Sequence, residues 1–308
     1  MPAPSSRLPR WSLVLALLPG CGFFGAGADP FQIAFRGGAG YWPENSRVAV
    51  DHALAAQYDG LHVDVVVTND EVAVMHRGAY LSPELCTAEN GAPFTADEVR
   101  IGDLSFEDLE DLYRCGGIAN PDYPEASTAE DTLAPLSYLV EALANGNSGA
   151  LVQLNVIYKD GDTTNAESVA RSVLDTWFLV DPGNRFYLSA DNADIIAALD
   201  AHAAEIGRDG QVTTSLVWPD NTSFGASAAA DLGQTLGLAD PVAQARAANA
   251  DGVMMAAEMM DRQMARKAQS AGLQVQVWDA DGKAREGAFA RWPVDVVVTA
   301  FPGDEVTP

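Results

Sequence analysis

The stretch Ile33–Asn45, which reads IAFRGGAGYWPEN, decides how this chain is interpreted. Its apolar start is typical of a short strand, and a glycine-rich loop follows it. The loop carries one arginine, Arg36, and one carboxylate, Glu44. Arginine suits a phosphate group and glutamate suits a hard cation. Because glycines let a backbone approach a ligand closely, the stretch predicts a binding loop at the end of a strand.

The composition indicates one large globular unit with an acidic surface. The 308 residues are 48% hydrophobic, and the formal net charge is −25 from 43 acidic and 18 basic residues. The sequence has no run of basic residues, so we expect no nucleic-acid partner. The acidic balance favours solubility, and it repels anions only over about 10 Å in physiological salt.

The N-terminus has the pattern of an export signal. Arg7 and Arg10 precede the apolar run Trp11–Leu18, which is too short for a bilayer span of about 20 residues. The run leads to Cys21, and this ending resembles a bacterial lipoprotein signal with cleavage before Cys21 and lipid on its sulfur. The alternative is an ordinary secretory signal cut after Ala28.

From this pattern we expect a signal peptide over residues 1–20 and a linker over residues 21–30. The protein would then be exported to a bacterial periplasm or cell surface and anchored through its lipid, or secreted in the alternative. Cys86 and Cys115 remain, and two cysteines in an exported chain fit one disulfide. Such a bond contributes roughly 3–4 kcal/mol. Two separate buried thiols are the alternative.

Strand patterns alternate with helical patterns from residue 31 to residue 305. The predicted strands are Gln32–Phe35, Gly60–Val67, Ala150–Ile157, Arg185–Ser189, Gln211–Val217, Gly252–Met255, Leu273–Trp278 and Val294–Thr299. The predicted helices between them are Ser46–Gln57, Ala166–Leu179, Asn192–Ile206, Asp240–Ala250, Asp261–Ala271 and Gly282–Arg291. This alternation predicts an α/β fold, a single (β/α)8 TIM-type barrel. An open doubly wound sheet is the alternative, but no G-x-G-x-x-G motif follows a strand.

A long segment separates the second predicted strand from the third. After the hairpin Val66–His76, residues 77–134 hold both remaining cysteines, several prolines and the helical piece Ser105–Tyr113. A second helical piece, Pro135–Ala144, leads back to the barrel. Because long excursions from a barrel are usually functional, we expect this insertion to take part in the site.

Taken together, these motifs resemble the glycerophosphodiester phosphodiesterase family. That family opens with a strand ending in His-Arg-Gly, followed by Pro-Glu-Asn. This chain keeps Arg36, Gly37, Glu44 and Asn45 and has Phe35 at the position of a catalytic histidine. The resemblance runs in order from about residue 31 to residue 303. It implies a TIM-type barrel with a small insertion after the second strand and an active site at one mouth.

The second strand predicts a polar pair inside the barrel. Because side chains alternate along a strand, His62 and Asp64 share a face, and burying them unpaired would cost several kcal/mol. The resemblance implies a divalent metal bound by Glu44, His62 and Asp64, with His62 at the position of a family glutamate. A hydrogen-bonded pair of His62 and Asp64 without metal is the alternative.

The third strand carries amides where the family carries charges. Gln153 stands at the position of a metal-binding glutamate, and Asn155 at that of a lysine. Gln153 is therefore a weak ligand at best, and the expected affinity for calcium or magnesium falls. Manganese or zinc tolerates a histidine better, and the metal can also be absent.

The segment Val72–Arg77 resembles a family strand that ends in His-Asp. The resemblance implies that His76 is the remaining acid–base group, acting together with Arg36, and Arg77 replaces the aspartate. Losing a proton-transfer partner, as Phe35 implies, lowers a rate by roughly 10²–10⁴-fold.

Trp278 ends a strand in a way that resembles a pocket-lining tryptophan of the family, with plain barrel packing as the alternative. Ala300 stands where the family's closing Thr-Asp-x-Pro has its aspartate. The implied substrate-binding residues are Arg36, Asn45, Arg77 and Trp278.

Two functional hypotheses follow. In the first, the chain is an envelope phosphodiesterase that hydrolyses glycerophosphodiesters weakly or with altered specificity. In the second, it is a catalytically inactive barrel lipoprotein that binds a phosphate-bearing lipid or envelope ligand.

Overall fold

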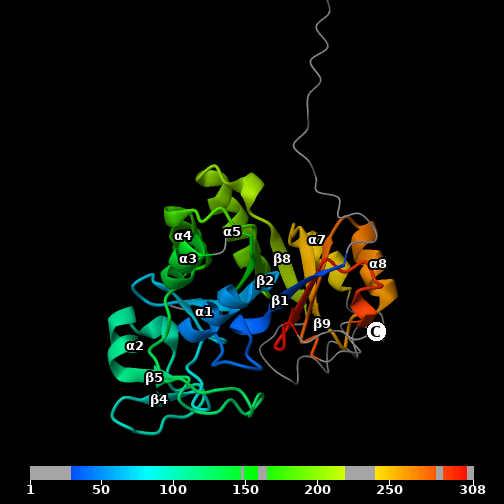
Figure 1. Ribbon diagram of the computed structural model, residues 1–308. Helices are drawn as coiled ribbons and strands as arrows, with labels where there is room; N and C mark the ends of the chain where they lie inside the picture. Colours follow the sequence, from blue (N-terminus) through cyan, green and yellow to red (C-terminus); the bar gives the residue numbers. More distant parts are fainter. Residues whose placement is uncertain (1–28, 147–148, 159–164, 219–239, 282–286, 304–308) are drawn as a thin grey trace, which may run out of the picture.

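Eight parallel strands close into a ring in the computed structural model (Figure 1). The model describes residues 29–146, 149–158, 165–218, 240–281 and 287–303. Around the ring the strands follow the order β1, β2, β6, β7, β8, β9, β10 and β11, and β11 pairs back with β1. This closure confirms the predicted (β/α)8 barrel and excludes the open sheet.

The strands of the ring are β1 (Phe31–Ala34), β2 (Gly60–Val67), β6 (Leu151–Val156), β7 (Phe186–Ala190), β8 (Thr214–Trp218), β9 (Gly252–Ala256), β10 (Gln274–Trp278) and β11 (Val296–Thr299). The short strand β3 (Ala73–Met75) pairs antiparallel with β2. The helices are α1 (Arg47–Ala56), α2 (Phe106–Leu112), α3 (Leu136–Asn145), α4 (Ala166–Val180), α5 (Ala193–Glu205), α7 (Pro241–Ala247) and α8 (Arg262–Ser270).

The alternation of side chains along the strands separates two buried layers. Outward-facing residues such as Leu61, Val63 and Val65 join the main core between strands and helices. Inward-facing residues form a second, smaller cluster around Ile33, Met254 and others, interrupted by polar side chains. The apolar layer holds the barrel together, and the polar interior is where a site can lie.

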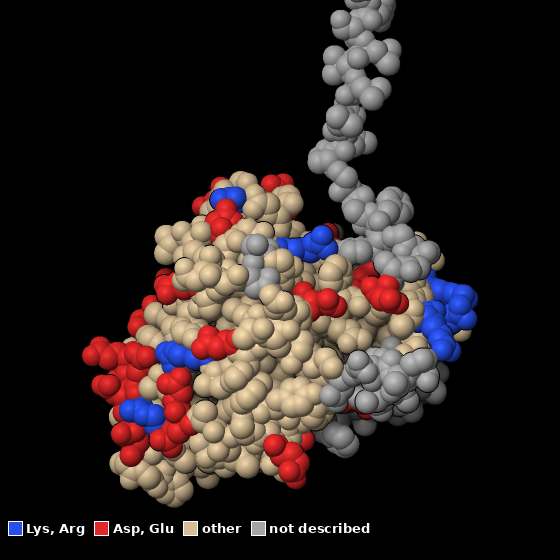
Figure 2. All heavy atoms as spheres, in the orientation of Figure 1, with Lys and Arg blue, Asp and Glu red and all other residues tan. Residues whose placement is uncertain are grey.

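The insertion after β3 forms a lobe of its own beside α1 (Figure 1). It contains α2 and the hairpin of β4 (Cys86–Ala88) and β5 (Tyr113–Cys115), and its apolar side chains pack in one cluster with Val66 of β2 and Val74 of β3. The disulfide Cys86–Cys115 joins the two hairpin strands, which confirms the predicted bond. Figure 2 shows acidic side chains concentrated over the region of α2, whose sequence is FEDLEDL, and basic side chains gathered where α8 lies.

Several predicted strand ends differ from the structure by a residue or more, and two of these differences have a local cause. Phe35 was expected to end the first strand but begins a 3-10 turn, Phe35–Gly37, because Arg36 has a φ of 51° that no strand residue adopts. The strand expected from Gln211 begins at Thr214, since Asp209–Gln211 forms a turn.

Some expectations fall outside the described residues. The signal peptide, Cys21 and the linker up to residue 28 lie there, as does the start of the predicted helix Gly282–Arg291. Among the described helices, none is both long and apolar enough to cross a bilayer.

Candidate active site

The loop after β1 folds back so that its charged residues face the barrel interior. Arg36 is left-handed (φ 51°), and Gly37 follows with φ 81°. A Cβ on Gly37 would lie only 2.7 Å from the Cβ of Ala49, so only glycine fits against α1. The backbone N–H of Asn45 donates to the carbonyl of Arg36 at 3.0 Å. This closed loop brings Arg36, Glu44 and Asn45 to one place.

Asp64 on β2 is the centre of the hydrogen-bond network. Its Oδ2 accepts from Nε of Arg36 at 2.6 Å and from Nδ2 of Asn45 at 3.1 Å. Its Oδ1 accepts from Nδ2 of Asn155 at 2.8 Å. The Asp64 backbone N–H also donates to the side chain of Asn45 at 3.0 Å. Asn45, predicted to bind substrate, has both ends of its amide bound to Asp64.

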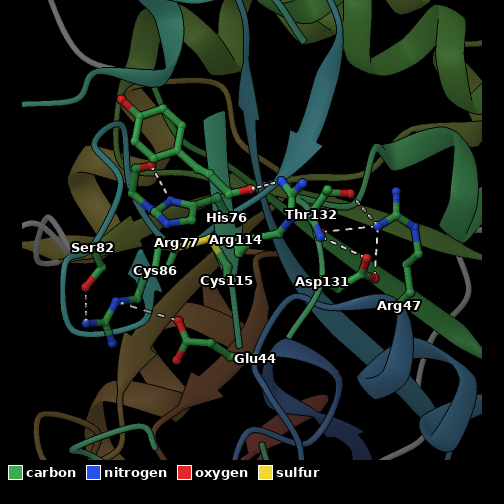
Figure 3. Close-up of a disulfide and its surroundings, with 12 residues drawn as sticks. Glu44, Arg47, His76, Arg77, Ser82, Cys86, Arg114, Cys115, Asp131 and Thr132 are labelled. Carbon is green, nitrogen blue, oxygen red and sulfur yellow. Dashed lines mark hydrogen bonds and ion pairs between the residues drawn. A yellow bond between two sulfur atoms is a disulfide. The ribbon is translucent and has the colours of Figure 1, made fainter. Parts of the chain in front are cut away.

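Glu44 is the second carboxylate of the network. Nη1 of Arg36 lies 3.3 Å from each of its oxygens, and Nδ2 of Asn120 donates to Oε2 at 2.9 Å. Nε of Arg77 lies 3.6 Å from Oε1. Figure 3 shows the Arg77 side chain between Glu44 and Ser82, close to the disulfide. Arg77 also pairs with Glu84 and Asp122 of the insertion.

Burial and charge together set the protonation of these groups. Burial alone raises the pKa of the Asp64 carboxyl, but the Arg36 guanidinium outweighs it, with help from His62 and the asparagine amides, so the pKa lies below its ordinary value. Burial alone lowers the pKa of Arg36, and Glu44 and Asp64 reverse this and raise it. The site therefore holds a fixed pair of opposite charges.

His62 is buried and uncharged. Burial lowers the pKa of its imidazole to about 4, although Asp64 opposes this shift. Its Nε2 lies 3.9 Å from Oδ1 of Asp64, and its ring stacks on that of Phe35 at a centroid distance of 5.2 Å. In the described part of the chain its Nδ1 has no hydrogen-bond partner. The structure therefore places His62 beside Asp64 with an aromatic ring against its face.

The part of the barrel interior next to β2, from β6 onward, is polar but neutral. Nε2 of Gln153 donates to Oε1 of Gln276 at 2.7 Å, and Nε2 of Gln276 donates to Ser215 at 2.9 Å. The hydroxyl of Ser189 donates to Asn155 at 3.2 Å, and Asn155 in turn donates to Asp64. The neutral hydrogen-bond network is thereby linked to the charged one. Gln153 is fully buried in the interior and carries no charge.

His76 directly follows β3, and its ring is buried. Its Nδ1 lies 2.8 Å from the carbonyl oxygen of Gly78, and burial lowers its pKa. Its Nε2 is buried and lacks a partner among the described residues. His76 lines a cavity of about 40 Å³ under the insertion, together with Glu44, Asn120 and the disulfide. That volume holds a few water molecules.

Arg36 itself borders a larger open cleft of about 620 Å³. Its walls come from the ends of β3, β6, β7 and β8 and from the insertion, and they include Arg77, Tyr80, Asp122, Asn155, Tyr158 and Asp191. This is the mouth formed by the carboxyl ends of the strands, where barrels of this type carry their sites. Trp278 lies at the end of β10 and packs between the two apolar layers, outside the described lining of the cleft.

The residues present do not fit a hard divalent cation. Such an ion needs several ionised oxygens with free lone pairs. Here Asp64 and Glu44 already accept from arginine and asparagine N–H groups, and Gln153 is engaged with Gln276. Within the described ranges, no group of three or more His, Cys, Asp or Glu side chains is arranged to hold a metal.

Three residues of the site, Asn120, Tyr123 and Asp281, were not predicted from the sequence. Asn120 of the insertion binds Glu44, and Tyr123 donates to Oδ2 of Asp281 at 3.2 Å. Asp281 also accepts from the backbone N–H of Ala300 at 2.7 Å. A carboxylate from the loop after β10 therefore binds the end of β11, where Ala300 stands in place of the family's aspartate. The Asn-Pro and Asp-Tyr-Pro pattern around residue 121 indicates a turn. A turn pattern does not predict that Asn120 and Tyr123 bind residues far away along the chain.

The fold and this site define a class: a TIM-type barrel with an arginine-bearing cleft at the carboxyl ends of its strands. A profile of the Glycerophosphoryl diester phosphodiesterase family matches residues 36–304. The chain belongs to this family, as its motifs indicate, and the family supports a phosphodiesterase-like function.

Solved structures agree with the fold. A putative glycerophosphoryl diester phosphodiesterase from Silicibacter pomeroyi has a TM-score of 0.76 at 18% identity, covering 91% of this chain and 92% of that chain. An Oleispira antarctica phosphodiesterase, solved in complex with the product sn-glycerol-3-phosphate, has a TM-score of 0.66 at 16% identity, covering 89% of this chain and 94% of that one.

Curated relatives match a smaller part of the chain than the solved structures do. An uncharacterized protein of Mycobacterium tuberculosis strain CDC 1551 is 26% identical over 199 residues, which cover 63% of this chain and 60% of the relative. The chain therefore matches about three fifths of that relative's length.

Proposed function

We propose that this protein binds glycerophosphodiesters in the 620 Å³ cleft and hydrolyses them slowly or not at all. One observation carries the proposal: the Arg36 guanidinium borders this cleft while two buried carboxylates hold it in place. A fixed guanidinium is a good anchor for a phosphate oxygen. The complex of the Oleispira antarctica relative with sn-glycerol-3-phosphate supports a ligand of this kind.

The slow or absent turnover rests on the groups that would move protons. Phe35 cannot donate or accept a proton, and its ring covers His62. His76 lines the small cavity under the insertion, whereas Arg36 lines the larger cleft. A ligand held by Arg36 therefore has no described histidine in the lining of its own cleft. The loss of such a partner lowers the rate roughly 10²–10⁴-fold.

The charges around the cleft favour a diester over a monoester. Glu84, Asp97, Asp122 and Asp191 line the cleft beside Arg36 and Arg77. A phosphodiester carries one negative charge, whereas a phosphomonoester carries close to two at pH 7. We therefore expect glycerophosphocholine to bind more tightly than sn-glycerol-3-phosphate.

Calorimetric titration with glycerophosphocholine tests the binding. We expect saturable binding, weakened roughly 10- to 100-fold by Arg36→Gln, because a hydrogen bond to a charged group is worth about 1.5–3 kcal/mol. Arg208→Gln is the matched control, since Arg208 pairs with Asp181 away from the cleft. No binding by the unmodified protein, or equal loss in both variants, would refute the proposed site.

A hydrolysis assay on the same samples tests the slow turnover. Release of glycerol phosphate should be near background and should rise when Phe35→His is combined with Gln153→Glu. Fast hydrolysis by the unmodified protein that disappears in His76→Ala would instead identify a working phosphodiesterase.

We also propose that the protein acts in the cell envelope. The basic and apolar pattern before Cys21 supports this, and so does the disulfide, because such bonds persist in oxidising compartments. Metabolic labelling with a fatty acid should mark the protein in the membrane fraction, and Cys21→Ser should abolish the label. Unlabelled protein in the soluble secreted fraction would favour the secretory alternative.

A further inference from the structure

The Arg36 guanidinium lies between the two carboxylates of the site, 2.6 Å from Asp64 and 3.3 Å from Glu44. We infer that this guanidinium takes the place of a metal ion between the two carboxylates, and that the protein binds its ligand without a divalent metal. The inference rests on the proposed function for the identity of the ligand. It departs from the metal site that the resemblance implies.

Most of the lone pairs of Asp64 are already in use, since a carboxylate has about four acceptor positions. Nε of Arg36 and Nδ2 of Asn45 both donate to Oδ2, while Nδ2 of Asn155 donates to Oδ1. A cation approaching either oxygen would meet N–H hydrogens that carry positive partial charge. It would have to displace donors that are themselves buried and would then lack an acceptor, which is strongly unfavourable.

The buried carboxylates Glu44 and Asp64 already have a cation between them, because Arg36 pairs with both. Arg77 pairs with Glu44 as well, and also with the exposed carboxylates of Glu84 and Asp122. The neighbouring interior side chains are amides, hydroxyls and an uncharged imidazole. A divalent ion at Glu44 and Asp64 would face the Arg36 guanidinium, which both carboxylates already bind, so repulsion between the two cations opposes it.

Softer ions such as zinc accept imidazole ligands. His62 is the histidine nearest to Asp64, but the Phe35 ring stacks on it and the adjacent strand position holds neutral Gln153. Zinc sites need three or four protein ligands. One imidazole and a carboxylate already bound to arginine do not form such a set.

Metal titration of the EDTA-treated protein tests the inference. We expect that CaCl₂, MgCl₂, MnCl₂ and ZnCl₂ at about 1 mM leave the melting temperature unchanged, because a ligand stabilises only in proportion to its occupancy. Arg36→Gln should acquire a metal-dependent rise of several degrees, since it leaves Glu44 and Asp64 without their cation. Arg36→Lys is the matched control, because its ammonium keeps the charge and should prevent this gain.

The possible outcomes separate clearly. A saturable metal site in the unmodified protein that Asp64→Asn abolishes would overturn the inference. So would an Arg36→Gln variant that gains no metal response, or an Arg36→Lys variant that gains as much. Should Arg36→Gln not fold, the titration of the unmodified protein decides alone: a saturable site refutes the inference and its absence supports it.

Ligand titration distinguishes this inference from the proposed function. Equal binding of glycerophosphocholine in EDTA and in each metal salt supports both. Binding only in the presence of metal overturns the inference and leaves the function standing. Binding under neither condition refutes the proposed function, and the melting experiment still decides whether Arg36 replaces the metal.

Discussion

The two sides of the barrel interior are both polar, yet they are stabilised in different ways. On the side of β1, β2 and β3, the Arg36 cation lies between the carboxylates of Asp64 and Glu44. On the side of β6, β8 and β10, the uncharged Gln153, Gln276 and Ser215 form a chain of hydrogen bonds. Removing one partner on the charged side should lower the stability more than on the neutral side, because an unpaired ion in a buried site costs far more free energy than an unpaired amide.

The difference also explains where the insertion sits. Its Asn120 and Asp122 contact Glu44 and Arg77, which belong to the charged side (Figure 3 shows Glu44 and Arg77 beside the disulfide). The insertion thus covers Glu44, whereas Arg36 still borders the open cleft. Substitutions on the two sides should therefore differ in their effects.

The largest effect is expected from Asp64→Asn. It removes the carboxylate that holds Arg36 and leaves a buried guanidinium with one partner, which should lower the free energy of unfolding by roughly 3–5 kcal/mol. Urea unfolding at pH 7 measures this change. A loss below about 1 kcal/mol would show that the charged side is no more sensitive than the neutral one.

The next effect is expected from removing the disulfide. Cys86→Ser together with Cys115→Ser frees the hairpin of the insertion and should cost roughly 3–4 kcal/mol by the loop-entropy argument. Hydrogen exchange should rise mainly at the insertion and the loop around Glu44, and little in β7 and β8. Uniform exchange across the barrel would contradict the link between the insertion and the charged side.

A third effect depends on pH through His62. Its pKa is about 4 in the folded protein against 6.5 ordinarily, so between these values the unfolded chain binds a proton that the folded chain does not. The free energy of unfolding should therefore fall as the pH drops from 6.5 to 4, by about 3 kcal/mol from this group.

The variant His62→Phe should remove most of this fall in a series of urea unfolding curves. His202→Gln is the contrasting control, because the carboxylates of Asp175 and Glu205 raise the pKa of His202 and reverse the sign of its contribution. An unchanged slope in His62→Phe would mean that His62 is not buried in its neutral form.

The smallest effect is expected on the neutral side. Replacing Gln153 and Gln276 together by methionine removes both partners of their mutual hydrogen bond and preserves the volume approximately. The free energy of unfolding should change by about 1 kcal/mol or less, since replacing both members of such a pair is nearly neutral. A loss of unfolding free energy as large as that of Asp64→Asn would show that the two sides do not differ in their sensitivity to substitution.

Much of the fold could be predicted because it depends on local periodicity. The alternation along β2 placed His62 and Asp64 on the inner face, and the structure buries both there. The alternation of strands and helices predicted the closed ring. The pairing of Cys86 with Cys115 was predicted because the chain holds only one other cysteine, which was assigned to the lipid anchor.

The partners across the barrel could not be predicted in the same way. Asn155 is 91 positions from Asp64, Asn120 is 76 positions from Glu44, and Asp281 meets Tyr123 across 158 positions. No periodicity links such residues. His76 shows the same limit: its place at a strand end was predicted, but the cavity that it lines depends on how the insertion folds over β3.

By itself, the sequence determined which residues of β2 face the barrel interior, because alternation along an extended backbone is a local property. Through the family resemblance it also indicated that Phe35 replaces a histidine, and that Gln153 and Asn155 replace a glutamate and a lysine. Only the tertiary structure decided that Arg36 lies between Glu44 and Asp64, because ring closure and the folding of the insertion set the distances among segments that are remote along the chain.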